Sequence, residues 1–415
     1  PGGGFRPRET AFLFFWEPVQ RMSEPLMATY KRLPVTFARG EGVWLWDSNG
    51  KRYLDALSGI AVCGLGHAHP GLRDALCDQA GTLLHTSNLY RIEAQESLGE
   101  ALTTLAGMER VFFANSGAEA NEAAIKLARL HAHRRGIEQP AVLVMEASFH
   151  GRTLATLSAT GNRKVQAGFE PLVQGFVRVP YDDIGALETA AANRHNLAAV
   201  LVEPIQGEGG INVPGDDYLA RLRSMCDRHG WLLMLDEIQT GMGRTGRMFA
   251  HQHAGILPDV MTLAKGLGNG VPIGACLARG EAADVLGPGT HGSTFGGNPL
   301  ACRAATAVLE AIERQGLVDK AARVGEYLSS GFRTSLADVK GVREVRGRGL
   351  MLGIELDRPC GVLVERALES GLLINVTAEC VIRLLPPLII EQAEADLLLE
   401  TLSQLIRDFL DKAPD

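Results

Sequence analysis

The chain has 415 residues, of which 46% are hydrophobic and 21% are charged, and its formal net charge is −7. A chain of this length and composition can bury a sizeable core and is expected to divide into two or three domains. The acidic balance, without any basic block, argues against a nucleic-acid partner, and no apolar run approaches the ~20 residues that span a bilayer, so no membrane partner is expected.

The first 21 residues differ in character from the rest of the chain. They open with PGGG and precede the first methionine, Met22. Their one apolar run, AFLFFW at 11–16, is short for a signal sequence and lies between Glu9 and Glu17, with no small-residue cleavage site after it. We therefore expect residues 1–21 to be a non-native or disordered extension, not a signal.

Residues 22–75 are expected to form the N-terminal part of a small domain. From Val43 the sequence VWLWDSNGKRYLDAL alternates aromatic and polar residues around Asn49-Gly50. An Asn-Gly pair between alternating residues is a strong hairpin signal.

Residues 76–320 are expected to form a large α/β domain. Helical stretches alternate here with short, continuous apolar runs, at 111–114, 141–145, 198–202, 231–235 and 273–277. Continuous apolar strands between helices indicate a mostly parallel sheet that is buried on both faces. The remaining residues, 321–415, suggest helix, strands and helix, and would form the C-terminal part of the small α+β domain.

Polar residues follow several of these strands directly. Ligands of open α/β sheets bind beyond the carboxyl ends of the strands, so these segments are the candidate site. They read NSGAEANE after the run at 111–114, EASFHGR after 141–145, EPIQGEGG after 198–202 and DEIQ after 231–235.

The first of these segments is a small-residue turn that opens a helix. Backbone N–H groups at such a helix start can bind an anion, and the small side chains of Gly117 and Ala118 would let a phosphate approach. A plain helix cap by Ser116 explains the same residues equally well.

Lys265 follows an apolar run in VMTLAKGLGNGVPIG. Taken alone, this stretch favours a lysine that closes a strand and extends its ammonium group into water. The alternative is a lysine in an enclosed site, where desolvation lowers the pKa of the amine and frees it to attack a carbonyl carbon.

Two other site classes fit poorly. The segment GMGRTG at 241–246 matches the dinucleotide pattern GxGxxG, but polar residues separate it from the strand and no amphipathic helix follows. The histidine pairs HAH at 67–69 and 131–133 and HQH at 251–253 are spaced two apart, so on a helix they face different directions, and no metal-ligand spacing accompanies them. No metal is expected.

The anion-binding turn, Asp236 and Lys265 together suggest pyridoxal 5'-phosphate (PLP). This cofactor withdraws electrons from a C–H bond next to an amine. Its phosphate requires a helix start, its ring nitrogen a buried carboxylate and its aldehyde a lysine.

The motifs NSGAEANEAAIK, SFHGRT, VEPIQGEGG, LDEIQTGMGRTG, TLAKGLGNGVPIG and HGSTFGGNPLA resemble those of the class III PLP-dependent aminotransferases. They occur in order between about Tyr30 and Pro387, so the resemblance covers nearly all of the chain after Met22. It implies a PLP-dependent transferase of fold type I, with a large domain and a small α+β domain built from both chain ends. Within the class, SGIAVCGLGHAHP and HQHAGILPDVMTLAKG are most similar to the bacterial enzymes that act on N-acetylornithine.

The resemblance implies a role for each matching position. Lys265 would bond to the cofactor aldehyde and then move the proton between substrate and cofactor carbons, and Asp236 would pair with the pyridine nitrogen. Gln239 would lie near the phenolic oxygen, and Glu237 and Ile238 are expected beside it among the cofactor-binding residues.

The same resemblance assigns the phosphate, the ring face and the substrate. Gly117 and Ala118 would bind the phosphate with Thr294 of the neighbouring subunit, and Phe149 would stack on the ring. The substrate-binding residues would be Arg152, which clamps the distal carboxylate, with Ser293, Glu208 and Arg383.

Glu208 and Arg383 would solve a charge problem in this family. One pocket must accept a terminal amine without an adjacent carboxylate and also 2-oxoglutarate, which has one. Arg383 would bind that carboxylate, and Glu208 would pair with Arg383 when the carboxylate is absent, since an unpaired buried charge is costly. A simple salt bridge between lobes is the alternative interpretation.

The expected reaction converts N-acetyl-L-ornithine and 2-oxoglutarate to N-acetyl-L-glutamate 5-semialdehyde and L-glutamate, in arginine biosynthesis. Succinylornithine, succinyl-diaminopimelate, ornithine and 4-aminobutyrate are alternative donors, of which ornithine is disfavoured because Ile60 stands where ornithine-specific relatives carry a tyrosine. A binding protein that retains the fold and a dehydrogenase are the alternatives from other classes. A homodimer with shared active sites is implied, and seven scattered cysteines favour the reducing cytoplasm.

Overall fold

The computed structural model describes residues 25–411. The described residues belong to two units, residues 25–35 to the first and residues 36–411 to the second, which contains all the helices and strands given below. The predicted extension at residues 1–21 lies outside the described residues.

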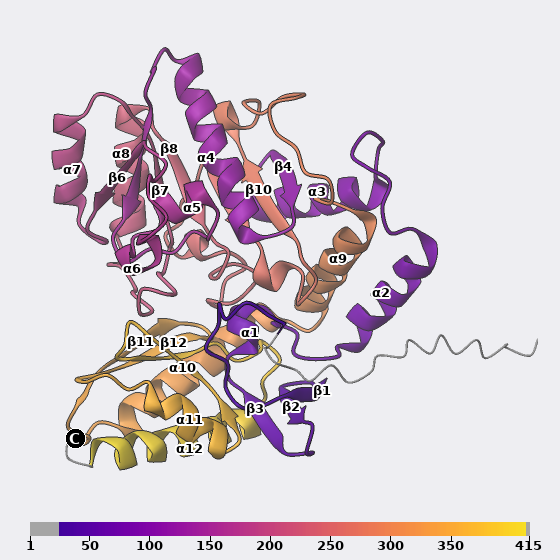
Figure 1. Cartoon of the computed structure of the whole chain (residues 1–415), viewed down its shortest axis with the longest axis vertical. Coiled ribbons are helices and arrows are strands. Elements are labelled where there is room, and N and C mark those ends of the chain that lie inside the picture. The colour runs from indigo at the N-terminus through magenta and orange to yellow at the C-terminus, as the bar shows by residue number, and fades with distance from the viewer. Residues whose placement is uncertain (1–24, 412–415) are drawn as a thin grey trace, which may run out of the picture. The chain divides into compact units, whose positions relative to one another are not determined.

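A seven-stranded sheet forms the centre of the larger part of this unit (Figure 1). Its strand order is β4-β10-β9-β8-β7-β5-β6, and all neighbours from β9 to β6 are parallel, whereas β10 runs antiparallel to both β4 and β9. The prediction of a mostly parallel sheet is therefore confirmed. The strands are β4 (Arg110–Ala114), β5 (Ala141–Met145), β6 (Phe176–Val179), β7 (Leu197–Val202), β8 (Leu232–Asp236), β9 (Val260–Leu263) and β10 (Gly274–Ala278).

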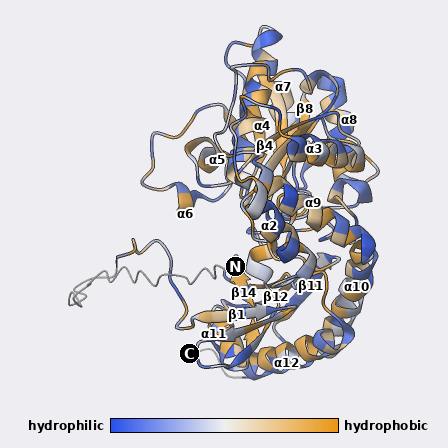
Figure 2. Cartoon of the chain, turned by 90° about the vertical axis from the view of Figure 1, so that its right-hand side faces the viewer, coloured by the Kyte–Doolittle hydropathy of each residue, from blue (hydrophilic) through white to orange (hydrophobic). Residues whose placement is uncertain are grey.

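Both faces of this sheet are covered, because successive side chains of a strand point to opposite sides. Val142 and Val144 of β5 pack in one cluster with helix α4 (Gly117–Arg134), whereas Leu143 and Met145 pack in another with helix α8 (Tyr218–His229). Hydropathy colouring shows hydrophobic strands between these helix layers (Figure 2). The continuous apolar runs in the sequence reflect this two-sided burial.

The remaining helices connect the strands or lie at the chain ends of the unit. They are α1 (Ser58–Ala61), α2 (Pro70–Thr82), α3 (Glu93–Ala106), α5 (Leu154–Ala159), α6 (Arg163–Gln166), α7 (Ile184–Asn193), α9 (Pro299–Arg314), α10 (Leu317–Ser335), α11 (Val362–Glu369) and α12 (Gln392–Leu410). Three short 3-10 helices are η1 (Ala250–His253), η2 (Lys265–Leu267) and η3 (Gly280–Ala282).

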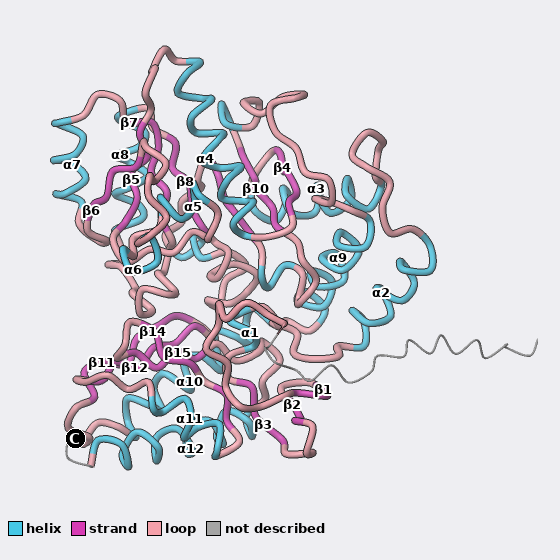
Figure 3. Tube along the Cα trace, viewed as in Figure 1, coloured by secondary structure: helices cyan, strands magenta, loops and turns pink. Residues whose placement is uncertain are grey.

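Two smaller sheets come from the two ends of the unit (Figure 3). The first has the order β1-β2-β3-β13 and the second β11-β12-β15-β14. Their strands are β1 (Phe37–Glu41), β2 (Trp44–Asp47), β3 (Arg52–Asp55), β11 (Val342–Arg348), β12 (Met351–Leu356), β13 (Leu372–Leu373), β14 (Asn375–Thr377) and β15 (Val381–Leu384). The antiparallel pair β2 and β3 confirms the hairpin predicted around Asn49-Gly50. Because β13 pairs with β3, the two chain ends share a sheet, but the domain boundaries at 75 and 320 stay predictions.

The glycine-rich segment at 241–246 lies in turns and leads into the short helix η1. A dinucleotide-binding turn would open a long helix at this point. The structure therefore contradicts the dehydrogenase alternative at the motif that suggested it.

Candidate active site

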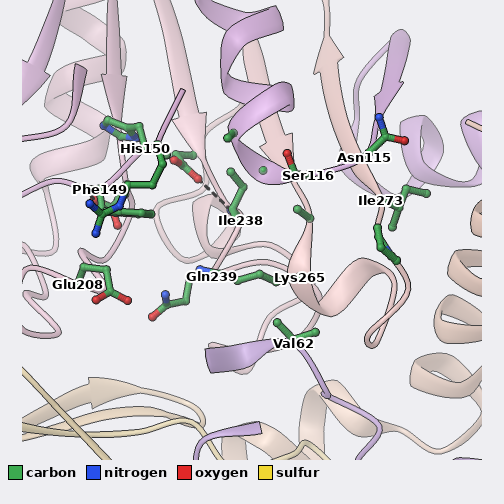
Figure 4. Close-up of a pocket in the computed structure, with 18 of the residues that line it drawn as sticks. Val62, Asn115, Ser116, Phe149, His150, Glu208, Ile238, Gln239, Lys265 and Ile273 are labelled. Atoms are coloured by element: carbon green, nitrogen blue, oxygen red, sulfur yellow. Dashed lines mark hydrogen bonds and ion pairs between the residues drawn. The ribbon is translucent and has the colours of Figure 1, made fainter. Parts of the chain in front are cut away.

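A cavity of about 390 Å³ lies at the carboxyl ends of the parallel strands. Segments that follow β4, β5, β7, β8 and β9 all contribute to it. In Figure 4, Gln239 and Lys265 lie between Glu208 on one side and Asn115 on the other. The predicted site residues that line the cavity are Gly117, Ala118, Phe149, Arg152, Glu208, Asp236, Ile238, Gln239 and Lys265.

Lys265 begins helix η2, just after β9 ends at Leu263. It is part-buried and borders the cavity. Burial lowers the pKa of its amine. Its backbone φ of 43° lies in the left-handed region, which non-glycine residues rarely adopt and which is found more often at functional sites. The sequence left two interpretations of Lys265 open. This placement fits an amine held inside a site, and it does not fit a lysine that closes a strand and extends its ammonium group into water.

Asp236 ends strand β8 and is 4% exposed. Its Oδ2 accepts hydrogen bonds from Asn121 Nδ2 and from the His150 ring, each at 2.8 Å, and its Oδ1 accepts one from the Ile238 amide at 3.1 Å. Thr262 Oγ1 in turn donates to Asn121 Oδ1 at 2.7 Å, which fixes the orientation of that amide. The carboxylate is therefore held in one position inside the cavity wall.

Sequence reasoning assigned no role to Asn121 and His150. The sequence and the fold each give a reason to assign them one. His150 directly follows Phe149 in a strand-end segment, and Asn121 is a fully buried polar residue among the alanines of α4. A buried polar residue must find a hydrogen-bond partner, and here the partner is the functional carboxylate.

The start of helix α4 combines the two roles that the sequence left open. Ser116 is the N-cap, and its Oγ accepts a hydrogen bond from the Glu119 amide at 3.2 Å. Gly117 and Ala118, the first two helical residues, line the cavity and have amides without a partner inside the helix. A Cβ on Gly117 would lie 2.7 Å from Ile238 Cδ1, so any larger residue there would displace the Ile238 side chain. Ser116 thus caps the helix while two amides stay available for an anion.

Gln239 is 8% exposed and carries an unsatisfied acceptor. Its Oε1 has no hydrogen-bond partner among the described residues. A Cβ on Gly207 would lie 2.3 Å from that oxygen, so the backbone of the neighbouring segment packs directly on the amide. An unsatisfied buried polar atom in a cavity wall indicates a place where a bound group supplies the missing partner.

Glu208 and Arg383 form an ion pair at the edge of the cavity, in which the Glu208 side chain is 38% exposed. Arg383 Nη1 donates to Glu208 Oε1 at 2.6 Å, and the Arg383 side chain is fully buried. Glu208 lines the cavity and Arg383 does not. The carboxylate therefore covers the guanidinium from the side on which a substrate would bind.

Four predicted site residues lie outside this lining. Arg383 is the first of them. Ser293 is the second, and it is linked to the lining because its Oγ accepts a hydrogen bond at 3.1 Å from Asn115, which does line the cavity. Thr294 is exposed. The carboxylate of Glu237 accepts hydrogen bonds from the amides of residues 250 and 251, so its side chain anchors helix η1.

Arg152 is an exposed residue of the cavity lining. Its guanidinium carbon is 5.6 Å from the centroid of the Phe149 ring, within the range of a cation–π contact. An arginine in this position can bind a carboxylate that enters the cavity.

Comparison with known proteins gives a consistent result. The family model for aminotransferase class III matches residues 26–406. The acetylornithine aminotransferase of Nitrosomonas europaea is 60% identical over 386 residues, which cover 93% of this chain and 98% of the relative.

Solved structures of two aminotransferases are similar to this chain over more than nine-tenths of its length. The N-acetylornithine aminotransferase of Stenotrophomonas maltophilia has a TM-score of 0.81 at 39% identity and covers 92% of this chain and 98% of its own. An ornithine aminotransferase of Toxoplasma gondii, with partial occupancy of PLP at its active site, has a TM-score of 0.88 at 37% identity and covers 92% of both chains. The predicted fold class is confirmed.

Proposed function

This chain belongs to the class III aminotransferases, and on that premise we propose that it transfers the terminal amino group of N2-acetyl-L-ornithine to 2-oxoglutarate. The products are N-acetyl-L-glutamate 5-semialdehyde and L-glutamate, and the reaction is a step of arginine biosynthesis. The observation that carries the substrate assignment is the 60% identity to an acetylornithine aminotransferase. The Glu208–Arg383 pair, at the edge of the cavity that Lys265 borders, supports a donor that has no carboxylate next to its reacting carbon.

The cofactor of this class is PLP, and the residues of the cavity fit it. The free amides of Gly117 and Ala118 suit its phosphate, and the buried carboxylate of Asp236 suits a protonated ring nitrogen. Gln239, whose amide is incompletely satisfied, would lie at the phenolic oxygen, and Phe149 would cover one face of the ring. When bound, PLP supplies an electron sink for the C–H bond next to the substrate nitrogen.

Lys265 does two things in this proposal. Its amine, whose pKa is lowered by burial, is deprotonated in a larger fraction of molecules near neutral pH and can bond to the cofactor aldehyde. With PLP bound, the Nζ of Lys265 would also be the group that takes a proton from the substrate carbon that carries the nitrogen. Asp236 would favour the protonated ring nitrogen through its negative charge, and Asn121 and His150 hold its carboxylate in place.

Glu208 and Arg383 let one cavity accept two kinds of substrate. N-acetylornithine brings no carboxylate next to its reacting carbon, so Glu208 stays on Arg383 and leaves no unpaired charge. Glutamate and 2-oxoglutarate bring such a carboxylate, and Glu208 would move aside for it. Arg152 would bind the more distant carboxylate of either substrate.

A homodimer is part of the proposal, because the predicted phosphate ligand Thr294 is exposed and does not line its own cavity. Next to Thr294 lies an exposed apolar surface, in which Asn88 links two loops by hydrogen bonds to the backbone oxygens of Ser293 and Gly296. The exposed fractions of its members are 51% for Leu84, 86% for Leu89, 69% for Tyr90 and 60% for Phe295. Such a surface suits a second copy of the chain, which would receive Thr294 in its own cavity.

Location in the cytoplasm is also proposed. All seven cysteines are free, which suits a reducing compartment. No helix in the described part of the chain is long and apolar enough to cross a membrane.

Steady-state kinetics with a panel of amino donors test the proposed function. The donors are N-acetylornithine, N-succinylornithine, succinyl-diaminopimelate, ornithine and 4-aminobutyrate, each with 2-oxoglutarate. We expect the highest kcat/KM for N-acetylornithine and a value at least about tenfold lower for ornithine, which corresponds to about 1.4 kcal/mol of transition-state binding. A preference for ornithine or 4-aminobutyrate would overturn the substrate assignment but not the reaction type.

A further inference from the structure

The guanidinium of Arg383 has three nitrogens in three different situations. Nη1 donates to the charged Glu208 at 2.6 Å, and Nε donates to the neutral Oδ1 of Asn375 at 2.9 Å. Nη2 is buried and has no hydrogen-bond partner among the described residues. The guanidinium is thus held at two points, and one of its three nitrogens keeps its donors free.

Strand β14 supplies contacts to both members of the ion pair. Asn375 lies directly opposite Arg383 in the antiparallel pairing of β14 with β15. Thr377, two residues further along β14, donates a hydrogen bond from Oγ1 to the backbone oxygen of Glu208. Side chains two apart on a strand point to the same face, so one face of β14 holds the arginine and the backbone of the glutamate.

Because Asn375 is neutral, it adds no negative charge beside the Arg383 guanidinium. The guanidinium cannot lose its proton in a protein, so burying it without a negative partner is costly. Glu208 is the only carboxylate that it contacts by an ion pair in the described structure. An aspartate at position 375 would be nearly the same size but would give Arg383 a permanent second partner.

We propose that Asn375 is a positioning residue that determines specificity: its neutral amide oxygen orients the Arg383 guanidinium without neutralising it, so that a substrate carboxylate and Glu208 compete for the same charge. The inference rests on the proposed function, since it explains how that site releases Arg383 from Glu208 when a dicarboxylate enters. Asn375 touches no reacting atom and acts through Arg383.

The test uses Asn375→Asp in the PLP-bound enzyme, with glutarate as a probe that binds like 2-oxoglutarate but cannot react. We expect glutarate to bind roughly 10- to 100-fold more weakly by calorimetry, because Arg383 is already paired. The single-turnover half-reaction with glutamate should slow by a similar factor, whereas that with N-acetylornithine should change by less than about threefold, since no carboxylate approaches Arg383 there.

A double variant makes the test sharper. Glu208→Gln leaves Arg383 without a counter-charge, and Asn375→Asp restores one from the other side. The variant that carries both changes should therefore react with N-acetylornithine faster than Glu208→Gln alone, by about tenfold or more. A merely structural role of Asn375 would make the two losses add.

Asn193→Asp is the matched control, because Asn193 is exposed at the end of α7, outside the cavity lining, and the change adds the same charge. It should leave glutarate binding unchanged. Three results would each overturn the inference: unaltered glutarate affinity in Asn375→Asp, additive losses in the double variant, or failure of Asn375→Asp to fold. The last result counts because the new carboxylate is expected to pair with Arg383 and should therefore not destabilise the protein. If the unmodified enzyme transferred no amino group from N-acetylornithine, the proposed function would be refuted instead. The glutarate affinities would still test the role of Asn375.

Discussion

At the scale of single residues, the site depends on charged groups that are held in a cavity at the carboxyl ends of the strands. Lys265 takes a left-handed backbone conformation at the start of η2, and Asp236 is fixed by Asn121 and His150. A non-glycine residue with positive φ costs of the order of 1 kcal/mol or more, which the surrounding structure must offset. The cavity therefore keeps its amine in place at some cost to stability.

The first prediction concerns Lys265. In Lys265→Ala, we expect the visible absorption band of the bound cofactor to be lost and turnover to fall by several orders of magnitude, because no amine remains to bond the aldehyde or carry the proton. The circular dichroism spectrum should match that of the unmodified protein. Turnover near the original level in the variant would refute the assignment of Lys265.

The sequence predicted the residues that follow strands directly, but not those that act through a neighbour. Lys265 and Asp236 stand next to apolar runs, and Glu208 lies in the polar segment that follows one, so the sequence showed that all three lie beyond strand ends. Asn375 lies inside the apolar stretch LLINV, and its contact with Arg383 arises from the register of β14 and β15. Register depends on pairing between distant segments, and the local sequence does not encode it.

At the scale of elements, the predicted strands of the central sheet agree with the structure to within a residue or two. The edge strand β6 was missed because Arg178 interrupts its short apolar pattern. The reversed direction of β10 was also not predicted, since an apolar run buried on both faces looks the same in either direction.

The segment that follows helix α1 gives a second prediction, which concerns stability and pH. His67 Nε2 lies 2.8 Å from Asp55 Oδ2, and their side chains are 17% and 3% exposed. Burial lowers the pKa of His67, but the hydrogen bond to Asp55, together with nearby Cys63, outweighs this and raises it to about 9. A histidine whose pKa is higher in the folded state stabilises that state fully below its unfolded pKa of about 6.5, and this contribution is lost as the pH rises through about 9.

Chemical denaturation of the unmodified protein and of His67→Gln measures this contribution. We expect the free energy of unfolding to differ by about 3 kcal/mol at pH 6, the value that corresponds to the raised pKa, and the difference to shrink towards about pH 10. A difference that stays constant across this range would show that His67 contributes by packing alone.

At the scale of the whole molecule, the third prediction concerns assembly. Phe295 is 60% exposed beside Thr294, and its ring lies 5.4 Å from that of His85. If this surface joins two copies, Phe295→Asp should shift the protein from dimer to monomer in sedimentation velocity and lower its activity with it. Leu397→Asp is the control, since Leu397 is 43% exposed on α12. Equal behaviour of the two variants would contradict the proposed interface.

The most direct test of the central claim compares two single-turnover half-reactions in Glu208→Gln. If Glu208 masks Arg383 only while the acylated amine is bound, the rate constant with N-acetylornithine should fall by roughly one to three decades, because the cation then faces an apolar chain without a partner. The half-reaction with glutamate should be unchanged or faster, since its carboxylate no longer competes with Glu208. The change in cofactor absorbance reports both rates. Equal losses in both half-reactions would contradict the exchange of partners on Arg383 and leave the pair a simple salt bridge.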